Sequence, residues 1–182
     1  MKISPTGFAD LYVLEPTVYT DPRGFFFESY NSETMQNLGI NIDFVQDNQS
    51  FSKRGVLRGL HFQKNPHAQT KLVSVLAGKI LDVVVDLRKG QPTFKKFFSV
   101  ELSDENNLQL FVPKGFAHAF VVLSESASVL YKCDVHYSKS NEGGIRFDDP
   151  DLNIDWHVPV DQLTLSEKDL KLPFLRDLDY HF

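Results

Sequence analysis

Short strand-like segments alternate with turn residues along the chain, and this pattern limits the possible folds more than any other feature. Nine segments are rich in Val, Phe, Leu and Tyr, which favour strands. They are LYVLEP, GFFFESY, FVQDNQSF, KLVSVLAG, KILDVVVDLR, FKKFFSVEL, LQLFVP, AHAFVVL and ASVLYKCDVHY. Turn residues separate several of them, at Asp21–Gly24, Ala77–Lys79, Lys89–Pro92 and Pro113–Gly115. The spacing predicts an all-β sandwich or barrel.

Two short helices are expected beside the strands. The first has Ser32 as its N-cap, covers roughly ETMQNL and stops at Gly39. The second begins at Ser166 and ends before Pro173. From about Asp149 the sequence is richer in Asp and Pro, and we expect this stretch to wrap the barrel as loops and short helices.

Length, charge and cysteine content narrow the class of protein. The 182 residues show no repeat or linker, so residues 1–182 are predicted to form one domain. A net charge of −5 provides no basic field for nucleic acid. The single cysteine, Cys133, permits no internal disulfide and is expected to be buried in a strand. Without a membrane-length apolar run or a signal-peptide core, the sequence predicts a cytoplasmic protein with no membrane partner.

The chain follows the frame of metal-binding cupins, small jelly-roll barrels with two spaced histidine motifs, but departs from it at two ligand positions. Gly55 is followed after five residues by His61, as the first motif requires. The second histidine of that motif is replaced by Gln63, and Lys71 stands where its glutamate belongs. The second motif reads PKGFAH and ends at His118. A protonated lysine has no lone pair to give and repels a cation, so no metal is expected.

These residue types suggest proton-transfer chemistry. A neutral imidazole can abstract a moderately acidic proton, and an ammonium can stabilise the oxyanion that forms beside it. With an acid on the opposite face, the result is an epimerase or isomerase acting next to a ketone. From these residues alone, an ordinary sheet with two packed core histidines is an equally open interpretation.

Longer blocks of sequence point to a known family. They are DPRGFFFES at 21–29, FVQDNQS at 44–50, GVLRGLHFQ at 55–63, AQTKLV at 68–73, DVVVDLRKGQPTF at 82–94, VPKGFAHAF at 112–120, LYKCDVHY at 130–137, DDPDLNIDW at 148–156 and LSEKDLKLP at 165–173. In these blocks the chain resembles the dTDP-4-dehydrorhamnose 3,5-epimerases over nearly its whole length. The resemblance implies an all-β, cupin-type jelly roll with a few short peripheral helices.

The resemblance also implies the catalytic residues. His61 would be the general base and Asp169 would orient it. Lys71 would stabilise the enolate oxygen at C4 of the sugar, and Tyr131 would be the acid that reprotonates carbon from the other face. Sequence alone favours blander roles, because Ser166 to Asp169 also forms a capping box and Tyr131 could be an ordinary strand tyrosine.

A larger set of residues would bind the substrate, dTDP-4-dehydro-6-deoxy-D-glucose, without any cofactor. Tyr137 would stack on thymine, and the other members of the set are Arg23, Glu28, Gln46, Asp47, Asn48, Arg58, His118, Glu142 and Lys168. As isolated polar residues, most would be interpreted as solvated surface. In the family the N-terminal segment with Arg23 and Glu28 serves the neighbouring subunit, which implies a homodimer.

Three other functions compete with the double epimerase. A 3-epimerase or a 5-epimerase of another deoxysugar pathway would share the same base and lysine. A binding module without turnover is disfavoured by the presence of His61, Lys71 and Tyr131. A metal-dependent cupin oxygenase is disfavoured by Gln63 and Lys71.

Overall fold

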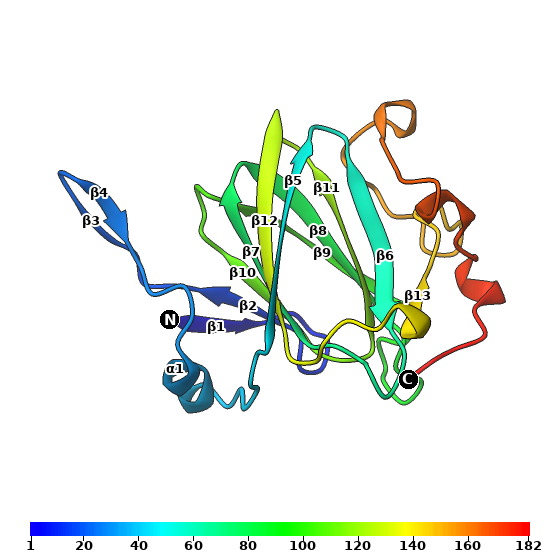
Figure 1. Cartoon of the computed structure of the whole chain (residues 1–182), viewed down its shortest axis with the longest axis horizontal. Helices are drawn as coiled ribbons and strands as arrows, with labels where there is room; N and C mark the ends of the chain where they lie inside the picture. The colour runs from blue at the N-terminus through cyan, green and yellow to red at the C-terminus, as the bar shows by residue number, and fades with distance from the viewer.

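The computed structural model describes residues 1–182, and its strands form two large antiparallel sheets that face each other (Figure 1). The six-stranded sheet has the order β1 (Lys2–Pro5), β2 (Tyr12–Glu15), β10 (Gln109–Val112), β7 (Lys71–Ala77), β12 (Ser126–Cys133) and β5 (Gln46–Lys53). The five-stranded sheet has the order β13 (Glu142–Gly144), β6 (Leu57–Gln63), β11 (Phe116–Val122), β8 (Lys79–Asp86) and β9 (Phe97–Ser103). The predicted all-β, cupin-type fold is confirmed.

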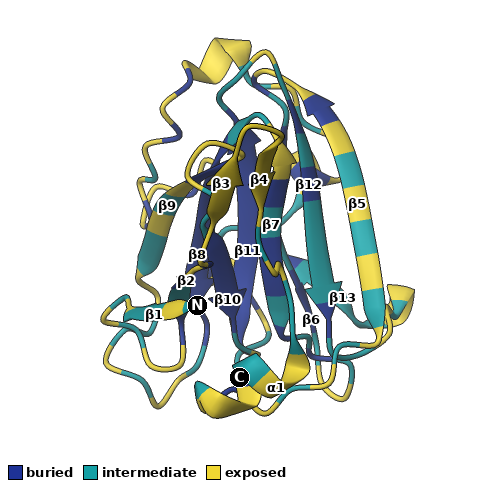
Figure 2. Cartoon of the chain, turned by 90° about the vertical axis from the view of Figure 1, so that its left-hand side faces the viewer, coloured by how far each residue is buried: buried dark blue, intermediate teal, exposed yellow.

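The central strands of the five-stranded sheet are buried on both faces, as Figure 2 shows for β8 and β11. A strand covered on both sides is apolar at successive positions, which explains the run ILDVVVD. Ile80 and Val84 pack with residues of the six-stranded sheet in the core between the sheets. Leu81 and Val83 belong to a second cluster on the outer face.

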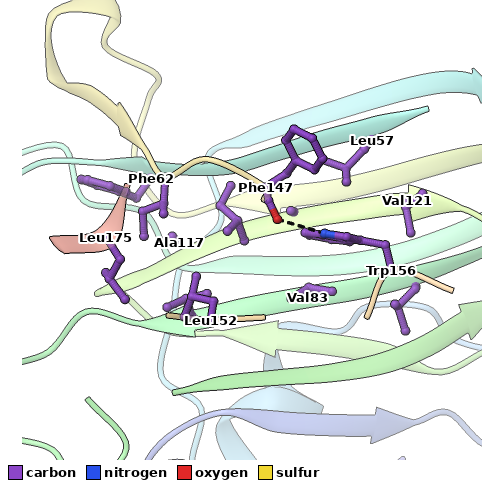
Figure 3. Close-up of a cluster of buried hydrophobic side chains, with 14 of the residues drawn as sticks. Leu57, Phe62, Val83, Ala117, Val121, Phe147, Leu152, Trp156 and Leu175 are labelled. Atoms are coloured by element: carbon purple, nitrogen blue, oxygen red, sulfur yellow. Dashed lines mark hydrogen bonds between the residues drawn. The ribbon is translucent and has the colours of Figure 1, made fainter. Parts of the chain in front are cut away.

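The C-terminal segment covers that outer face, as the sequence predicted. Leu152, Trp156 and Leu175 pack against the side chains of β8 and β11 (Figure 3). The indole N–H of Trp156 donates to the carbonyl of Phe147 at 3.0 Å, so the buried ring leaves no unpaired donor. This cover supports β6, β8 and β11 from behind.

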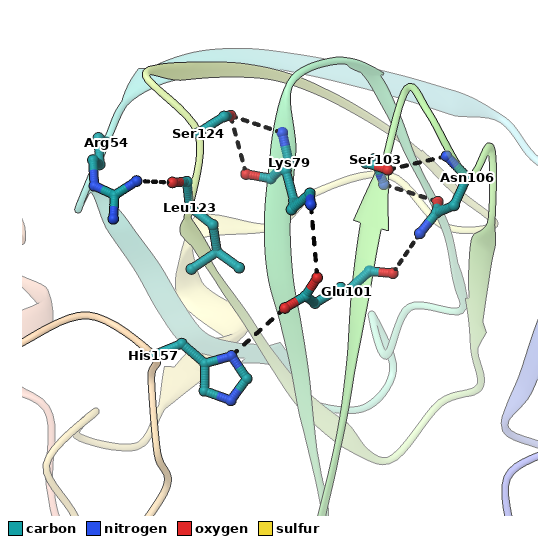
Figure 4. A network of polar contacts seen from close by, with 8 residues as sticks. All are labelled: Arg54, Lys79, Glu101, Ser103, Asn106, Leu123, Ser124 and His157. Atoms are coloured by element: carbon teal, nitrogen blue, oxygen red, sulfur yellow. Dashed lines mark hydrogen bonds and ion pairs between the residues drawn. The ribbon is translucent and has the colours of Figure 1, made fainter.

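The turn at Gly78 joins the two sheets rather than two neighbouring strands. Gly78 has φ +82°, and a Cβ there would collide with the carbonyl oxygen of Ser126. The Ser124 hydroxyl accepts from the backbone N–H of Lys79 at 2.8 Å (Figure 4). It also donates to the Ser126 carbonyl at 2.7 Å. These bonds fix one end of the barrel.

The first predicted helix is present, but its cap differs. Helix α1 spans Ser32–Asn37, and its N-cap is Asn31 rather than Ser32. The Asn31 side chain accepts from the backbone N–H groups of Glu33 and Thr34, and the backbone of Asn31 is extended, as a cap requires. A hairpin of β3 (Tyr19–Asp21) and β4 (Gly24–Phe26) precedes α1 and projects from the barrel (Figure 1).

The prediction of a second helix, from Ser166 to the residue before Pro173, is wrong, because no α-helix forms there. Only a 3-10 turn, η3 (Asp169–Lys171), forms there: the Lys171 N–H donates to the Lys168 carbonyl three residues earlier, and Pro173 does not continue a helix. The other 3-10 turns are η1 (Lys139–Asn141), η2 (Val160–Gln162) and η4 (Leu175–Asp177). None of the helices is long and apolar enough to cross a membrane.

Candidate active site

Two cavities open between the sheets, and three predicted catalytic residues line both of them. The larger has a volume of about 490 Å³ and the smaller about 120 Å³. His61, Lys71 and Tyr131 belong to both linings. We call the two cavities together the cleft.

His61 and Asp169, the predicted base and its orienting carboxylate, are in contact in the cleft. His61 Nε2 lies 2.6 Å from Asp169 Oδ1, and the His61 side chain is 30% exposed while that of Asp169 is 5% exposed. Burial opposes ionisation of Asp169, but hydrogen bonds from His61, Ser166 and the Gly59 backbone hold its pKa below the usual value. Since an ionised carboxylate only accepts, Nε2 of neutral His61 carries the proton and Nδ1 is the free base.

Ser166 and Asp169, the two ends of the apparent capping box, have different roles. Ser166 Oγ accepts the Asp169 backbone N–H at 3.1 Å, so the serine provides the cap. The Asp169 carboxylate is directed to His61 instead. Ser166 therefore caps the local turn, and the Asp169 side chain orients the imidazole of His61.

The second histidine lies opposite the first. His118 on β11 is the cross-strand partner of His61 on β6, and it lines the larger cavity. Its Nε2 lies 2.5 Å from Oδ1 of Asp82, a fully buried carboxylate. A charge or dipole buried in this way needs a partner, and the contact fixes the His118 ring against the wall of the cleft.

Lys71 and Tyr131 face these histidines from the other sheet. Lys71 begins β7 and Tyr131 lies on the neighbouring strand β12, with the Lys71 ammonium 5.7 Å from the centre of the Tyr131 ring. Burial lowers the pKa of Lys71, although Cys133, Asp82 and Glu142 act in the opposite direction. Burial raises the pKa of Tyr131, with Cys133 adding to the rise and Arg58 opposing it, so the phenol keeps its proton at neutral pH.

Arg58 is oriented by one contact. Its Nε donates to Ser52 Oγ at 3.1 Å, and Ser52 is 5% exposed. The Arg58 side chain makes no other hydrogen bond within the chain, so both terminal NH₂ groups are free to contact an anion. Arg58 lines the larger cavity.

The smaller cavity is lined by four of the residues predicted to bind the substrate at its nucleotide end: Gln46, Asn48, Tyr137 and Glu142. The Tyr137 hydroxyl donates to Glu142 at 2.9 Å, and Glu142 forms an ion pair with Lys168. Gln46 and Asn48 line the same cavity and are joined at 2.9 Å. Tyr137 is 51% exposed, so one face of the ring is accessible.

Three predicted binding residues lie away from the cleft of their own chain. Asp47 points to the other side of β5, where it pairs with Lys132 at 3.0 Å. Arg23 lies on the projecting hairpin and contacts only Asp21. Glu28 follows the hairpin and accepts from Asn31 and Thr34.

The donor set at the cupin metal position does not fit a divalent cation. No group of three or more His, Cys, Asp or Glu side chains gathers there or elsewhere. Each histidine has one ring nitrogen on a carboxylate, and Lys71 occupies the position of the missing ligand. A cation there would meet an ammonium rather than a carboxylate.

Sequence reasoning missed several residues of the cleft. Ser50 and Ser52 follow Gln46 and Asn48 at every second position of β5, so the alternation of a strand could have found them. Phe120 lies two residues beyond His118 and could have been found in the same way. No sequence signal pairs Asp82 with His118, because their contact depends on the register of β8 and β11.

The fold and the site together define a β-sandwich with a cleft of ionisable side chains between its sheets. The family model for dTDP-4-dehydrorhamnose 3,5-epimerases matches residues 5–177. The chain is 51% identical over 177 residues to the dTDP-4-dehydrorhamnose 3,5-epimerase of Salmonella typhimurium, covering 96% of each. It therefore belongs to the dTDP-4-dehydrorhamnose 3,5-epimerase family.

Solved structures of two 3,5-epimerases are similar to this chain over nearly its whole length. The crystal structure of dTDP-4-dehydrorhamnose 3,5-epimerase from Elizabethkingia anophelis has 54% sequence identity and a TM-score of 0.94, with 99% of each chain covered. The dTDP-6-deoxy-D-glucose-3,5-epimerase of Legionella pneumophila, in complex with dTDP-4-keto-L-rhamnose, has 47% identity and a TM-score of 0.93. It covers 98% of this chain and 94% of its own.

Proposed function

We propose that the chain inverts C3 and C5 of dTDP-4-dehydro-6-deoxy-D-glucose, giving dTDP-4-dehydro-L-rhamnose. It is an epimerase of nucleotide-sugar biosynthesis. The observation that carries the assignment is the division of acid and base between the sheets. His61 belongs to the five-stranded sheet, and Tyr131 and Lys71 belong to the six-stranded sheet. A sugar ring between them meets a base on one face and an acid on the other, as inversion requires.

The chemistry follows from these positions. Nδ1 of His61 takes the proton from the carbon beside the 4-keto group, and the electron pair moves onto the carbonyl oxygen. The Lys71 ammonium stabilises the resulting enolate. Tyr131 then delivers its proton to the opposite face of the carbon. Before the second inversion, His61 returns its proton to solvent and Tyr131 regains one, so both carbons can use the same groups.

The remaining residues bind and place the substrate. We assign Arg58 and His118 to the sugar and its phosphates. Tyr137 stacks on thymine, with Gln46, Asn48, Glu142 and Lys168 around it. The support is their shared lining of the cleft.

We further propose a homodimer in which each hairpin reaches the neighbouring cleft, where Arg23 and Glu28 bind the nucleotide; Asp47 binds it from β5 of its own chain. Phe25 and Phe26 on the hairpin are 62% and 71% exposed. On the outer face of the six-stranded sheet, Phe51 and Leu76 are also exposed. Apolar surface of this extent supports burial against a second copy.

We also propose that residues 1–182 form one domain working in the reducing cytoplasm. The C-terminal segment packs on the same sheet that carries the base, and Asp169 completes the dyad from that segment. The thiol of Cys133 is buried and free.

Incubation with the 4-keto sugar nucleotide in D₂O, followed by NMR of the product, tests the activity. We expect deuterium at both C3 and C5, because each inversion exchanges a carbon-bound proton with a solvent-equilibrated group. Deuterium at one carbon would identify a single-site epimerase. Unlabelled, unchanged substrate would contradict the enzymatic assignment.

A further inference from the structure

The segment between β12 and β13 crosses from one sheet to the other (Figure 1). It carries Tyr137 and Ser138 across the side of the barrel between β5 of the six-stranded sheet and β6 of the five-stranded sheet. Two consecutive backbone N–H groups of this segment are satisfied by glutamine side chains. Tyr137 N–H donates to Gln46 Oε1 at 3.0 Å, and Ser138 N–H donates to Gln63 Oε1 at 2.9 Å.

The two glutamines come from opposite sheets. Gln46 begins β5 in the six-stranded sheet, and Gln63 ends β6 in the five-stranded sheet. Gln63 is 5% exposed, so its amide is fixed by packing and also lines the smaller cavity. The crossing segment is therefore attached to both walls of the cleft.

The same arrangement fixes the far end of the Tyr137 ring. Gln63 is the cross-strand partner of Glu142, and Glu142 accepts the Tyr137 hydroxyl at 2.9 Å. Tyr137 is thus held at its backbone N–H by the Gln46 amide and at its hydroxyl by the Glu142 carboxylate. About half of the residue stays exposed and is available to a planar ligand.

We propose that Gln63, together with Gln46, is a positioning residue that places Tyr137 for stacking on the nucleobase. This inference rests on the proposed function, since it assumes a thymidine nucleotide as the ligand. Position 63 is where a metal-binding cupin has a histidine ligand. Here the side chain serves the nucleotide end of the cleft and not the reacting carbons.

An amide suits this task for a physical reason. The backbone N–H needs an acceptor, and an amide carbonyl supplies one without adding charge beside the diphosphate. A methionine at position 63 would keep much of the volume while removing the acceptor. The half-buried Ser138 N–H would then lose its protein partner.

Isothermal titration of wild type and Gln63→Met with dTDP and with inorganic pyrophosphate tests the proposal. Loss of one hydrogen bond of ordinary strength should weaken dTDP binding about threefold to tenfold. Pyrophosphate binding should be unchanged, because it makes no use of the ring. KM for the sugar nucleotide should rise while kcat stays near the wild-type value.

Two further measurements separate positioning from general destabilisation. In a Tyr137→Ala background, Gln63→Met should cause no additional loss of dTDP affinity. Hydrogen exchange at the Ser138 amide should accelerate in Gln63→Met. If that variant does not fold, Gln63→Asn, whose shorter amide does not reach the Ser138 N–H, should give the same pattern.

Equal dTDP affinity in wild type and both variants would overturn the proposal while leaving the epimerase assignment intact. A parallel loss of pyrophosphate affinity, or an undiminished loss in the Tyr137→Ala background, would also overturn it. If the wild type itself fails to bind dTDP, the proposed function fails instead.

Discussion

At the scale of single residues, the two histidines of the cleft differ in exposure although each contacts a carboxylate. The His61 side chain is 30% exposed and that of His118 is 7% exposed. Only the more accessible imidazole can exchange protons readily with solvent, as a base used twice per turnover must. The more buried one is better suited to donate or accept a fixed hydrogen bond.

Removal of the carboxylate behind His61 should therefore be costly. Asp169→Asn keeps the shape but can stabilise the wrong tautomer, placing the proton on Nδ1 and blocking the base. We expect kcat to fall about 10²–10⁴-fold with deuterium incorporation lost at both carbons in parallel. Reactions in D₂O that are stopped at set times and analysed by NMR measure kcat and the deuterium at C3 and C5. Retained exchange at one carbon would mean that a different base serves it.

Lys71 should set the alkaline limit of activity. Its charged form is required, and burial lowers its pKa, so activity is present below the folded-state pKa and lost as pH rises through it. That limb should lie below the ordinary lysine value of about 10.4. Lys71→Met should lower kcat about 10²–10³-fold and abolish the limb. A pH profile of kcat with an unchanged limb in this variant would assign the titration to another group.

At the scale of elements, the turn after β8 depends on one buried carboxylate. Asp86 is fully buried and accepts from Arg88 Nε at 2.9 Å and from the Thr93 hydroxyl at 2.7 Å. Burial alone would raise its pKa, but the hydrogen bonds from Arg88 and Thr93 lower it below the usual value. This network connects β8 to the loop that leads to β9.

Asp86→Asn should destabilise the fold by about 3–5 kcal/mol at neutral pH, because it removes the nearer and more buried of the two carboxylates that pair with the largely buried Arg88 guanidinium. Since folding lowers the pKa of Asp86, its stabilisation is present above the unfolded-state value of about 3.9 and is lost as pH falls through the folded-state value. Urea unfolding at pH 7 and near pH 3 should show a smaller difference between variant and wild type in acid. Asp43→Asn, at an exposed position, is the control.

Sequence predicted these elements to different degrees, for physical reasons. Apolar runs such as that of β8 predict doubly covered strands, and the spacing of the histidine motifs predicts a pocket lined by His61, Lys71 and His118. The strand that contains His61 has glycine and polar residues that weaken the strand propensity, so only the histidine motif marks this segment in the sequence. The N-cap was displaced by one residue because Asn31 and Ser32 are both good caps, and only the backbone angles choose between them.

At the scale of the whole molecule, the proposed dimer predicts that each cleft needs residues of two chains. Mixed dimers can test this directly. His61→Ala lacks the base, and Arg23→Ala lacks the predicted contact to the neighbouring nucleotide. Each homodimer should be impaired, but a mixed dimer would contain one cleft with both residues intact.

Unfolding and refolding the two variants together should therefore restore about one quarter of wild-type activity, since half of the dimers are mixed and one of their two clefts is complete. Sedimentation should show dimers throughout. If Arg23 acted within its own chain, no cleft in the mixture would be complete and activity would remain at the level of the separate variants.

The attachment of Tyr137 by neutral amides has a consequence for ionic strength. Dissolved salt screens the attraction between guanidinium groups and a diphosphate, but it has little effect on a bond between an amide carbonyl and a backbone N–H. The ring should stay in place in concentrated salt while the phosphate contacts weaken. Thymidine, which lacks the diphosphate, should then lose less affinity than dTDP as salt is raised, so that recognition of the base becomes the larger share of binding.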